Sequence, residues 1–483
     1  MNTSYLQKCL ALTLVCLSMG GGEAATQSTG LRVGTAAVDI TPDVFPIQLR
    51  SGRSDYVHDP LHVRAVAFEN GEGRAVLALI DAIGYGRERS DEAKAIVAKA
   101  TGWKPEQMLL SATHTHTAPK GGEDMPGRVA YEEKRFQGIV KALTQAIRTL
   151  EPAEVGWAKD EEPGEVYNRR WLLKPGVVML HPLGKKDKVR TNGPRDKILK
   201  PAGPTDPEVC VVLARTRKGR PLGLIANYAL HYVGGIPKVA GEKGREIGMA
   251  SADYYGEFAR LMPSRMRNPA NNFVAFMSNG SSGDINNIDF YGTRPPRAPF
   301  EQIRIVAQKT ADAAWRAVQK IRTYERNPVV AMRQREVEIR YRRPSPGDVE
   351  LAEQVLKLPR KERDAINKRS ASVANNTVNF AGPDAPTTEK VLVQAVRIGD
   401  QAIVTMPFEV LVEIGLEIKA KSPFPYTFMA ELANGGYGYL PPPNQFPLGG
   451  YETWLGTSKF AEDTSVILTR HLLEMLAELK AAP

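Results

Sequence analysis

The chain has 483 residues, of which 42% are apolar and 24% charged, and its formal net charge is +10 at pH 7. This is the composition of a globular protein long enough for one large domain or two moderate ones. Excess Lys and Arg can favour an anionic surface or substrate. Here the basic residues are scattered and accompany no nucleic-acid-binding motif, which excludes a nucleic-acid partner and indicates a solvated, moderately basic surface.

The first 25 residues have the pattern of a secretory signal peptide. Lys8 supplies a positive charge, Cys9 to Met19 form an apolar core, and Ala24-Ala25 supply small residues for cleavage. No later run approaches the roughly 20 apolar residues of a membrane span. We therefore predict a secreted or periplasmic protein with a mature domain over residues 26–483.

Strands and helices alternate along the rest of the chain. Period-two and short apolar runs predict strands at 33–39, 63–68, 75–80, 108–110, 208–216, 222–228, 273–277, 329–341, 391–398, 402–406 and 428–432. Helical periodicity predicts helices at 90–101, 130–149, 303–321, 347–368, from 407 onward, and at 462–480. This order predicts an α/β fold: a single large domain with a mixed β-sheet core layered with helices. Residues 343–388 are predicted to be an insertion, helical at first and mobile over 370–388.

The stretch Ser111 to Pro119 reads Ser-Ala-Thr-His-Thr-His-Thr-Ala-Pro and directly follows the apolar run 108–110. In α/β sheets, ligands bind at the carboxyl ends of strands. If the stretch stays extended, His114 and His116 point to the same face. Neutral imidazole is the commonest protein ligand for zinc. A single His-x-His pair more often lies on a surface loop, so a metal site is predicted only if other residues of the chain can supply further ligands.

Other residues able to bind a metal also follow apolar runs. His231 follows the run 222–228, and Glu409 stands at the predicted start of a helix. Two histidines and a carboxylate form a known catalytic zinc set with an open position for water. A Glu in the first turn of a helix can equally be a dipole partner. Asp81 and Asp284 either orient ligand imidazoles or serve as turn or cap residues.

Several blocks of this sequence resemble the catalytic domain of the neutral/alkaline (non-lysosomal) ceramidase family. Ser111–Pro119 with Gly121-Gly122 is similar to the family's His-Thr-His-Ser-Gly-Pro-Gly-Gly segment. Further blocks occur in the family's order and together span about residues 31–460: Asn168-Arg169, Asp206-Pro207-Glu208, Asn227–His231, Pro407-Phe408-Glu409, Leu432-Ala433-Asn434, Gly438-Tyr439 and Tyr451.

The resemblance implies one Zn²⁺ ion held by His114, His231, Glu409 and Tyr439. It implies that His116, Arg169 and Tyr451 line the pocket and hold the scissile carbonyl and the developing oxyanion. We assign His116 as the candidate general acid or base, because histidine titrates near neutrality. An N/O site of this type would also accept other divalent ions.

Two features depart from the family's pattern. Ser278-Asn279 is separated from Gly283-Asp284 by three residues where the family has one. Ser278 is therefore predicted to be only a helper beside a metal-activated water, and Ser281 and Ser282 are shifted alternatives. A small-residue turn needs no catalytic serine. The family also has a C-terminal β-sandwich domain, whereas this sequence stops after one more helix.

We predict an exported zinc hydrolase that cleaves the N-acyl amide of a ceramide- or sphingolipid-like small molecule, with peripheral membrane contact left open. One alternative keeps the zinc and changes the substrate to another amide, an ester or a carbohydrate conjugate. A second alternative is an exported binding protein without catalysis. Fold alone does not decide among the three.

Overall fold

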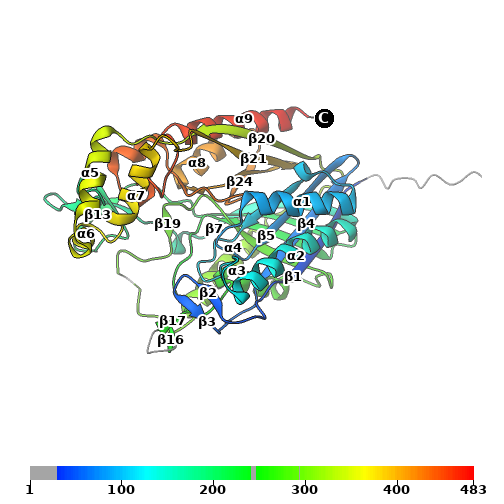
Figure 1. The fold of residues 1–483 in the computed structure, drawn as a ribbon. Helices are drawn as coiled ribbons and strands as arrows, with labels where there is room; N and C mark the ends of the chain where they lie inside the picture. Colours follow the sequence, from blue (N-terminus) through cyan, green and yellow to red (C-terminus); the bar gives the residue numbers. More distant parts are fainter. Residues whose placement is uncertain (1–29, 241–245, 293, 483) are drawn as a thin grey trace, which may run out of the picture.

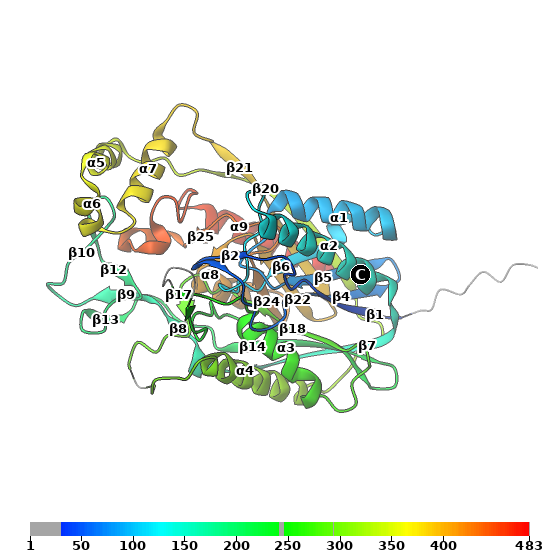
Figure 2. The same cartoon turned by 60° about the horizontal axis from the view of Figure 1, so that its bottom comes forward.

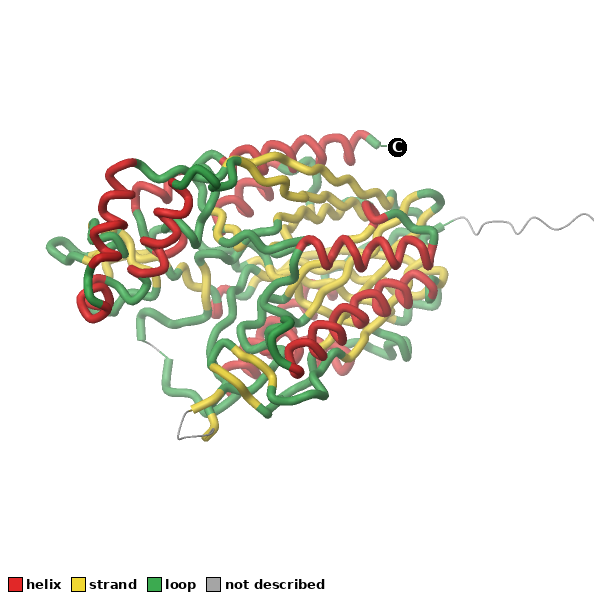
Figure 3. Tube along the Cα trace, viewed as in Figure 1, coloured by secondary structure: helices red, strands yellow, loops and turns green. Residues whose placement is uncertain are grey.

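The computed structural model describes residues 30–240, 246–292 and 294–482. The predicted signal peptide lies outside this range. Two β-sheets stack against each other in the centre, and helices cover their outer faces (Figures 1 and 3). The predicted α/β class with a mixed β-sheet is confirmed, and its strands form two stacked sheets.

The larger sheet has eight strands in the order β18-β15-β14-β7-β1-β4-β5-β6. Their bounds are β1 Arg32–Asp39, β4 His62–Asn70, β5 Gly73–Ile80, β6 Met108–Ala112, β7 Glu151–Glu161, β14 Glu208–Thr216, β15 Pro221–Tyr228 and β18 Val274–Asn279. The pairs β15–β18 and β5–β6 are parallel, and the others are antiparallel. β1 and β7 pair at only two positions, so this contact joins two four-stranded halves.

The second sheet has four strands in the order β20-β21-β22-β24. They are β20 Val330–Arg340, β21 Thr388–Ile398, β22 Gln401–Met406 and β24 Tyr426–Glu431. A buried apolar cluster lies between the sheets and takes residues from both, for example Val66, Ile225, Ile403 and Phe428. Burial of this surface is the main force that holds the two sheets together.

Six helices cover the outer faces. α1 (Arg87–Thr101) and α2 (Pro126–Arg148) cover the β1–β6 half of the larger sheet, and α3 (Asp253–Arg265) and α4 (Glu301–Gln319) cover the other half. α8 (Val412–Lys421) and α9 (Thr464–Ala481) cover the second sheet. The apolar stripes of α2, α4 and α9 face these clusters, as their periodicity predicts.

Three helices connect β20 to its antiparallel neighbour β21: α5 (Pro346–Lys357), α6 (Arg360–Ile366) and α7 (Ser370–Ala381). The single helix expected over 347–368 is split at Pro359, which has no N–H for a helical hydrogen bond. The segment expected to be mobile contains α7, because Val373 and Ala374 are buried against Trp454. Both ribbon views place these helices together at one end of the molecule (Figures 1 and 2).

Short strands form small sheets of two or three strands: β2 Ile47–Leu49, β3 Gly52–Ser54, β8 Tyr167–Asn168, β9 Arg170–Leu173, β10 Met179–Leu180, β11 Lys186–Asp187, β12 Val189–Thr191, β13 Ile198–Pro201, β16 Val239–Ala240, β17 Glu246–Ile247, β19 Ile285–Asn286, β23 Glu409–Val410 and β25 Tyr439–Leu440. Among the described helices, none is long and apolar enough to cross a membrane.

Candidate metal centre

The carboxyl end of β24 joins the two sheets at the site. On one side, the Ala112 N–H donates to the Leu432 carbonyl at 3.3 Å, and the Asn434 N–H donates to the Leu110 carbonyl at 2.8 Å. On the other side, Asn227 Nδ2 donates to the Met429 carbonyl at 2.9 Å. The ends of β6 and β15 are thereby held against the second sheet, which brings the residues that follow them together.

The loop after β6 is not extended, contrary to the expectation for His114 and His116. His114 adopts a φ of 66°, and its N–H donates to the Ala82 carbonyl at 2.9 Å. The chain therefore turns at His114, and the turn rather than strand alternation brings the two imidazoles together. The Nε2 atoms of His114 and His116 lie 3.2 Å apart.

A buried carboxylate that sequence reasoning missed fixes this loop. Thr115 Oγ1 donates to Asp253 Oδ2 at 2.6 Å, and Thr117 Oγ1 donates to Asp253 Oδ1 at 2.9 Å. Burial raises the pKa of Asp253 to about 7. The available signal was the alternation of threonines with histidines, which puts hydroxyl donors between the imidazoles.

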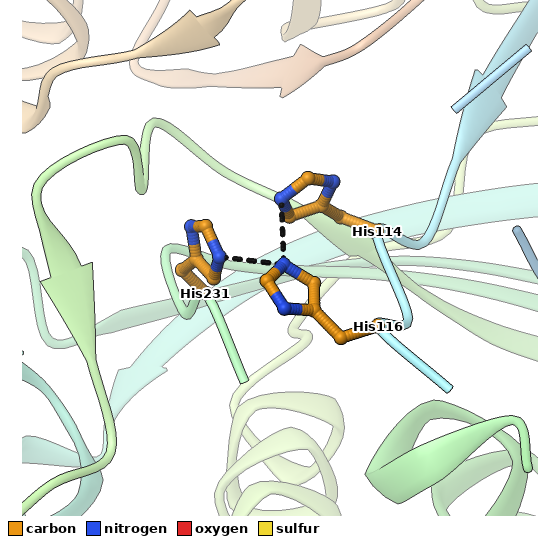
Figure 4. Close-up of side chains that lie close together, drawn as sticks. All are labelled: His114, His116 and His231. Atoms are coloured by element: carbon orange, nitrogen blue, oxygen red, sulfur yellow. Dashed lines mark hydrogen bonds between the residues drawn. The ribbon is translucent and has the colours of Figure 1, made fainter. Parts of the chain in front are cut away.

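His231 joins the pair from the loop after β15, so three imidazoles converge (Figure 4). Its Nε2 lies 2.8 Å from His116 Nε2. Its Nδ1 faces Arg169 at 3.3 Å and Glu409 Oε2 at 3.7 Å. Each imidazole ring is at least partly buried, and the rings meet edge to face.

The tautomer of His114 follows from its partners. Its Nδ1 lies 2.7 Å from the Ile83 carbonyl, which can only accept, so Nδ1 carries the proton. In the neutral ring, the Nε2 lone pair then faces Glu409 Oε2 at 3.4 Å. That carboxylate oxygen is buried and, with His114 neutral, accepts no hydrogen bond from the described residues. Two facing acceptors require a proton or a cation between them.

Glu409 and Tyr439 are neighbours in β-structure. β23 and β25 are parallel, and Glu409 pairs in register with Tyr439. The expectation that Glu409 opens a helix is wrong: pairing with β25 keeps the backbone extended, and α8 begins only at Val412. Their shared register explains how a carboxylate and a phenol distant in sequence reach the same site.

Arg169 is buried next to Tyr439. Its guanidinium donates to the Tyr439 hydroxyl at 3.0 Å and to the Gly283 carbonyl at 2.7 Å. Nε donates to Glu452 Oε1 at 3.0 Å, and the other oxygen of Glu452 accepts from Arg170 at 2.8 Å. Glu452, fully buried, was not anticipated from the sequence. It fixes the direction in which Arg169 points.

The three histidines differ in the direction in which their surroundings shift their pKa. Burial lowers the pKa of His116 to about 2, and burial with the nearby Arg169 lowers the pKa of His231 well below its ordinary value. Burial opposes protonation of His114 too, but the Glu409 carboxylate outweighs it and raises the pKa of His114. His116 and His231 are therefore neutral at pH 7, the form that binds metals.

The donor set fits a zinc ion. Ligands at about 2.0–2.2 Å in a tetrahedron lie about 3.3–3.6 Å from one another. The separations of Glu409 Oε2 from His114 Nε2 (3.4 Å) and from His231 Nδ1 (3.7 Å) are close to this range. A ligand imidazole usually donates its other N–H to a carbonyl or carboxylate, as His114 does to Ile83.

Of the other residues predicted for the site, Tyr451 contacts a candidate ligand and Ser278 is held within a strand. Tyr451 is adjacent, with its ring centroid 5.4 Å from that of Tyr439. Ser278 lies within β18, where it accepts from Asn227 at 2.9 Å and donates to the Ala226 carbonyl at 3.1 Å. Its catalytic role stays a prediction.

The shifted serines, Ser281 and Ser282, bond to Met429 Sδ and Glu431 Oε1 at 3.3 and 2.7 Å. Burial raises the pKa of Glu431 to about 8. The second oxygen of Glu431 accepts from the Val410 N–H at 2.8 Å, next to Glu409. The Ser282 hydroxyl thus helps to hold the Glu431 carboxyl group beside β23, and the Ser281 hydroxyl contacts β24 instead.

Neither candidate orienting carboxylate contacts an imidazole of the site. Asp81 forms a buried ion pair with Arg64 at 2.7 Å and accepts from the His62 N–H at 2.9 Å. Asp284 accepts from Asn168 Nδ2 at 2.7 Å and from the Val412 N–H at 2.8 Å. The Asp284 carboxylate therefore holds the side chain of Asn168, next to Arg169, and the first N–H of α8.

Comparison with solved structures identifies this arrangement of sheets and helices. A neutral ceramidase from Pseudomonas aeruginosa and a ceramidase complexed with C2 each superpose with a TM-score of 0.67, covering 94% of the present chain and 75% of their own. The chain has the neutral ceramidase fold. Sequence identity to both is 16%. No protein-family model matches the chain, and no curated protein matches its sequence.

Proposed function

We propose that this chain is an exported, zinc-dependent hydrolase that cleaves the N-acyl amide of a lipid-like molecule such as a ceramide. The observation that carries the proposal is the unpaired, buried Oε2 of Glu409, which faces two imidazoles in a fold shared with ceramidases. Export rests on the signal-peptide pattern of residues 1–25.

Two ligand sets are compatible with the geometry. The first combines His114, His231, Glu409 and Tyr439, and the second combines the three histidines alone. We favour the first, because it gives Glu409 Oε2 the cation that its lack of any hydrogen-bond partner calls for. His116 then stays free of the metal and keeps its contact with His231.

A zinc ion bound there would lower the pKa of a water molecule and polarise a substrate carbonyl. Arg169, fixed by Glu452 and the Gly283 carbonyl, presents its guanidinium beside Tyr439 and can stabilise negative charge that develops on the carbonyl oxygen. His116 is partly exposed and contacts His231, so it can pass a proton to or from the substrate. Burial lowers its pKa to about 2, so on its own it is a weak base and not one that titrates near neutrality. Tyr451 would orient the substrate.

The zinc content of the purified protein tests the proposal, with Glu409→Gln, His231→Ala and His116→Ala as variants and His471→Ala on α9 as the control. About one zinc per chain is expected in the wild type, in His116→Ala and in the control. Loss is expected in Glu409→Gln and His231→Ala. Loss in His116→Ala with retention in Glu409→Gln would establish the three-histidine set instead.

Hydrolysis of an N-acylsphingosine, measured by the fatty acid that is released, tests the substrate class with the same proteins. Activity should require zinc and should fall in Glu409→Gln in parallel with zinc content. A wild type that binds no zinc after resupply would contradict the hydrolase mechanism and support the binding-protein alternative.

A second substrate class is favoured by the polar lining of the adjacent cavity. Ser372, Asn376 and Thr457 lie around the space next to Glu409 and Tyr439. Polar side chains at this position suit a substrate with hydrogen-bonding or charged groups close to the scissile bond. The same zinc chemistry would then act on a more polar amide or ester.

A further inference from the structure

The cavity beside the candidate ligands has a volume of about 310 Å³. Glu409 and Tyr439 line it together with residues of α7 and of the loop 451–459. The insertion between β20 and β21 therefore forms part of the wall of the cavity next to the candidate ligands.

A second cavity of about 500 Å³ shares lining residues with the first. Arg369 and Tyr451 line both cavities, and the Arg369 guanidinium lies 4.6 Å from the centroid of the Tyr451 ring. This cation–π contact holds the charge over the ring of Tyr451, which lines both cavities. Such volumes are typical of sites for small organic ligands.

Cations are concentrated around this space. Arg369 and Lys459 line the first cavity, and Arg190 and Lys368 line the second together with Arg369. In the part of the chain that the structure describes, none of the four forms an ion pair with a carboxylate. Elsewhere, buried or half-buried cations such as Arg64 and Lys419 do form such pairs.

The carboxylates close to these cations are already engaged. Asp364, which lines the second cavity, lies 3.6 Å from Arg360. Asp187, near Arg190, accepts from Trp454 Nε1 at 3.0 Å. Glu409 is the proposed metal ligand. The Asp187 carboxylate offsets part of the charge of Arg190. Arg369, Lys368 and Lys459 have no carboxylate at ion-pair distance among the described residues, so their charge is available to a ligand.

The second cavity also has an apolar wall. Met179, Leu180 and Ile366 contribute apolar side chains to its lining, and Trp454 adds an aromatic surface. A ligand that fits such a cavity has both an apolar part and an anionic group.

We propose that the substrate of the candidate zinc site is an amphiphilic amide with an anionic group, a carboxylate or a phosphate, which Arg369 binds with Lys459 and Arg190 on either side. This inference rests on the proposed function and specifies its substrate. Guanidinium groups bind both anions through paired N–H donors, and a charged hydrogen bond is stronger than a neutral one. A neutral ceramide would make no use of these charges.

Binding of three amides with the same dodecanoyl chain tests the inference: N-dodecanoylglycine, N-dodecanoyl-phosphoethanolamine and the neutral N-dodecanoylethanolamine. Calorimetry is carried out on full-length protein depleted of metal by dialysis, so that binding is measured without turnover. The variants are Arg369→Gln, Arg369→Lys and, as the control, Arg470→Gln on α9. Arg369 is exposed, so its substitution should not disturb folding.

We expect the wild type to prefer an anionic amide to the neutral one by about 10- to 100-fold, with Arg369→Gln losing that preference. Arg369→Lys should restore part of it, and Arg470→Gln should behave as wild type. Whichever anionic amide binds more tightly identifies the group as carboxylate or phosphate.

Equal affinity of wild type and Arg369→Gln for the anionic amides, or no binding of any of the three, would overturn the inference. Hydrolysis is then measured with zinc restored. Anion-selective binding without hydrolysis would contradict the proposed function alone. Hydrolysis of the neutral amide, unaffected in KM by Arg369→Gln and as efficient as that of the anionic ones, would contradict the inference alone.

Discussion

Glu452 is the residue on which the orientation of Arg169 most depends. Its carboxylate is fully buried between the guanidiniums of Arg169 and Arg170 and also accepts from Thr191 Oγ1 at 2.6 Å. Removing one partner of a buried ion pair costs about 3–5 kcal/mol. We therefore expect Glu452→Gln to lower the free energy of unfolding by about this amount in urea titrations, whereas Glu417→Gln, in an exposed pair, should leave it within error.

The pH dependence of that difference follows from the pKa of Glu452. Burial acts to raise this pKa, but the two guanidiniums outweigh it, and the net result lies below the ordinary value of 4.5. A carboxyl group with a lowered folded-state pKa stabilises the fold above its unfolded-state pKa and ceases to do so as the pH falls through the folded-state pKa. The difference in free energy of unfolding between wild type and Glu452→Gln should therefore be constant from pH 7 to about pH 5 and shrink below about pH 4.5. A constant difference down to pH 3 would contradict this account.

Sequence reasoning found the proposed zinc ligands but not the residues that hold them. His114 and His231 follow apolar strands, and a resemblance of short blocks supplied Glu409 and Tyr439. Glu452 contacts Arg170 across 282 residues of sequence, and Asp253 contacts Thr115 across 138. A carboxylate that pairs at such separations leaves no periodic or local pattern in the sequence, so only the fold reveals it.

At the scale of elements, α8 is fixed at both ends. Asp284 Oδ1 accepts from the first N–H of the helix, and Lys419 in its last turn reaches Asp206 at 2.6 Å and Glu208 at 2.9 Å. The Lys419 side chain keeps 19% exposure, so water partly screens these pairs. We expect Lys419→Met to lower the free energy of unfolding by about 1–3 kcal/mol with zinc content unchanged.

A matched control for Lys419→Met is Lys421→Met, two residues further along α8, because its pair with Glu417 is exposed. Thermal unfolding of both variants measures the difference. Equal melting temperatures would show that the pairs of Lys419 add nothing to the docking of α8. Loss of zinc in Lys419→Met would show that the position of the helix, and not only its stability, controls Glu409.

The elements that sequence reasoning located and those that it missed differ in pattern. α2, α4 and α9 have continuous apolar stripes and were predicted within a few residues. β7, which links the halves of the larger sheet, was not predicted, because charged residues at both of its ends interrupt the apolar pattern. α3 contains Pro263 and was missed as well. Tertiary burial decides the structure of both segments.

At the scale of the whole molecule, the candidate ligands come from both sheets. His114 and His231 follow strands of the larger sheet, whereas Glu409 and Tyr439 lie in the short strands β23 and β25, which come after β22 and β24 of the second sheet. A metal that binds this set stabilises the folded state only, by about 4 kcal/mol when its free concentration is 1,000 times its Kd. Removing zinc should therefore lower the melting temperature of the wild type and speed amide hydrogen exchange at the ends of β6, β15 and β24 together.

Glu409→Gln and His231→Ala should show no increase in melting temperature when zinc is added, and His471→Ala should show the same increase as wild type. Magnesium at the same concentration should have little effect, because it prefers all-oxygen octahedral sites. If zinc raises the melting temperature of wild type and Glu409→Gln equally, the metal does not join the two sheets through this carboxylate. The three-histidine set would then be the better account, since all of its members follow strands of the larger sheet.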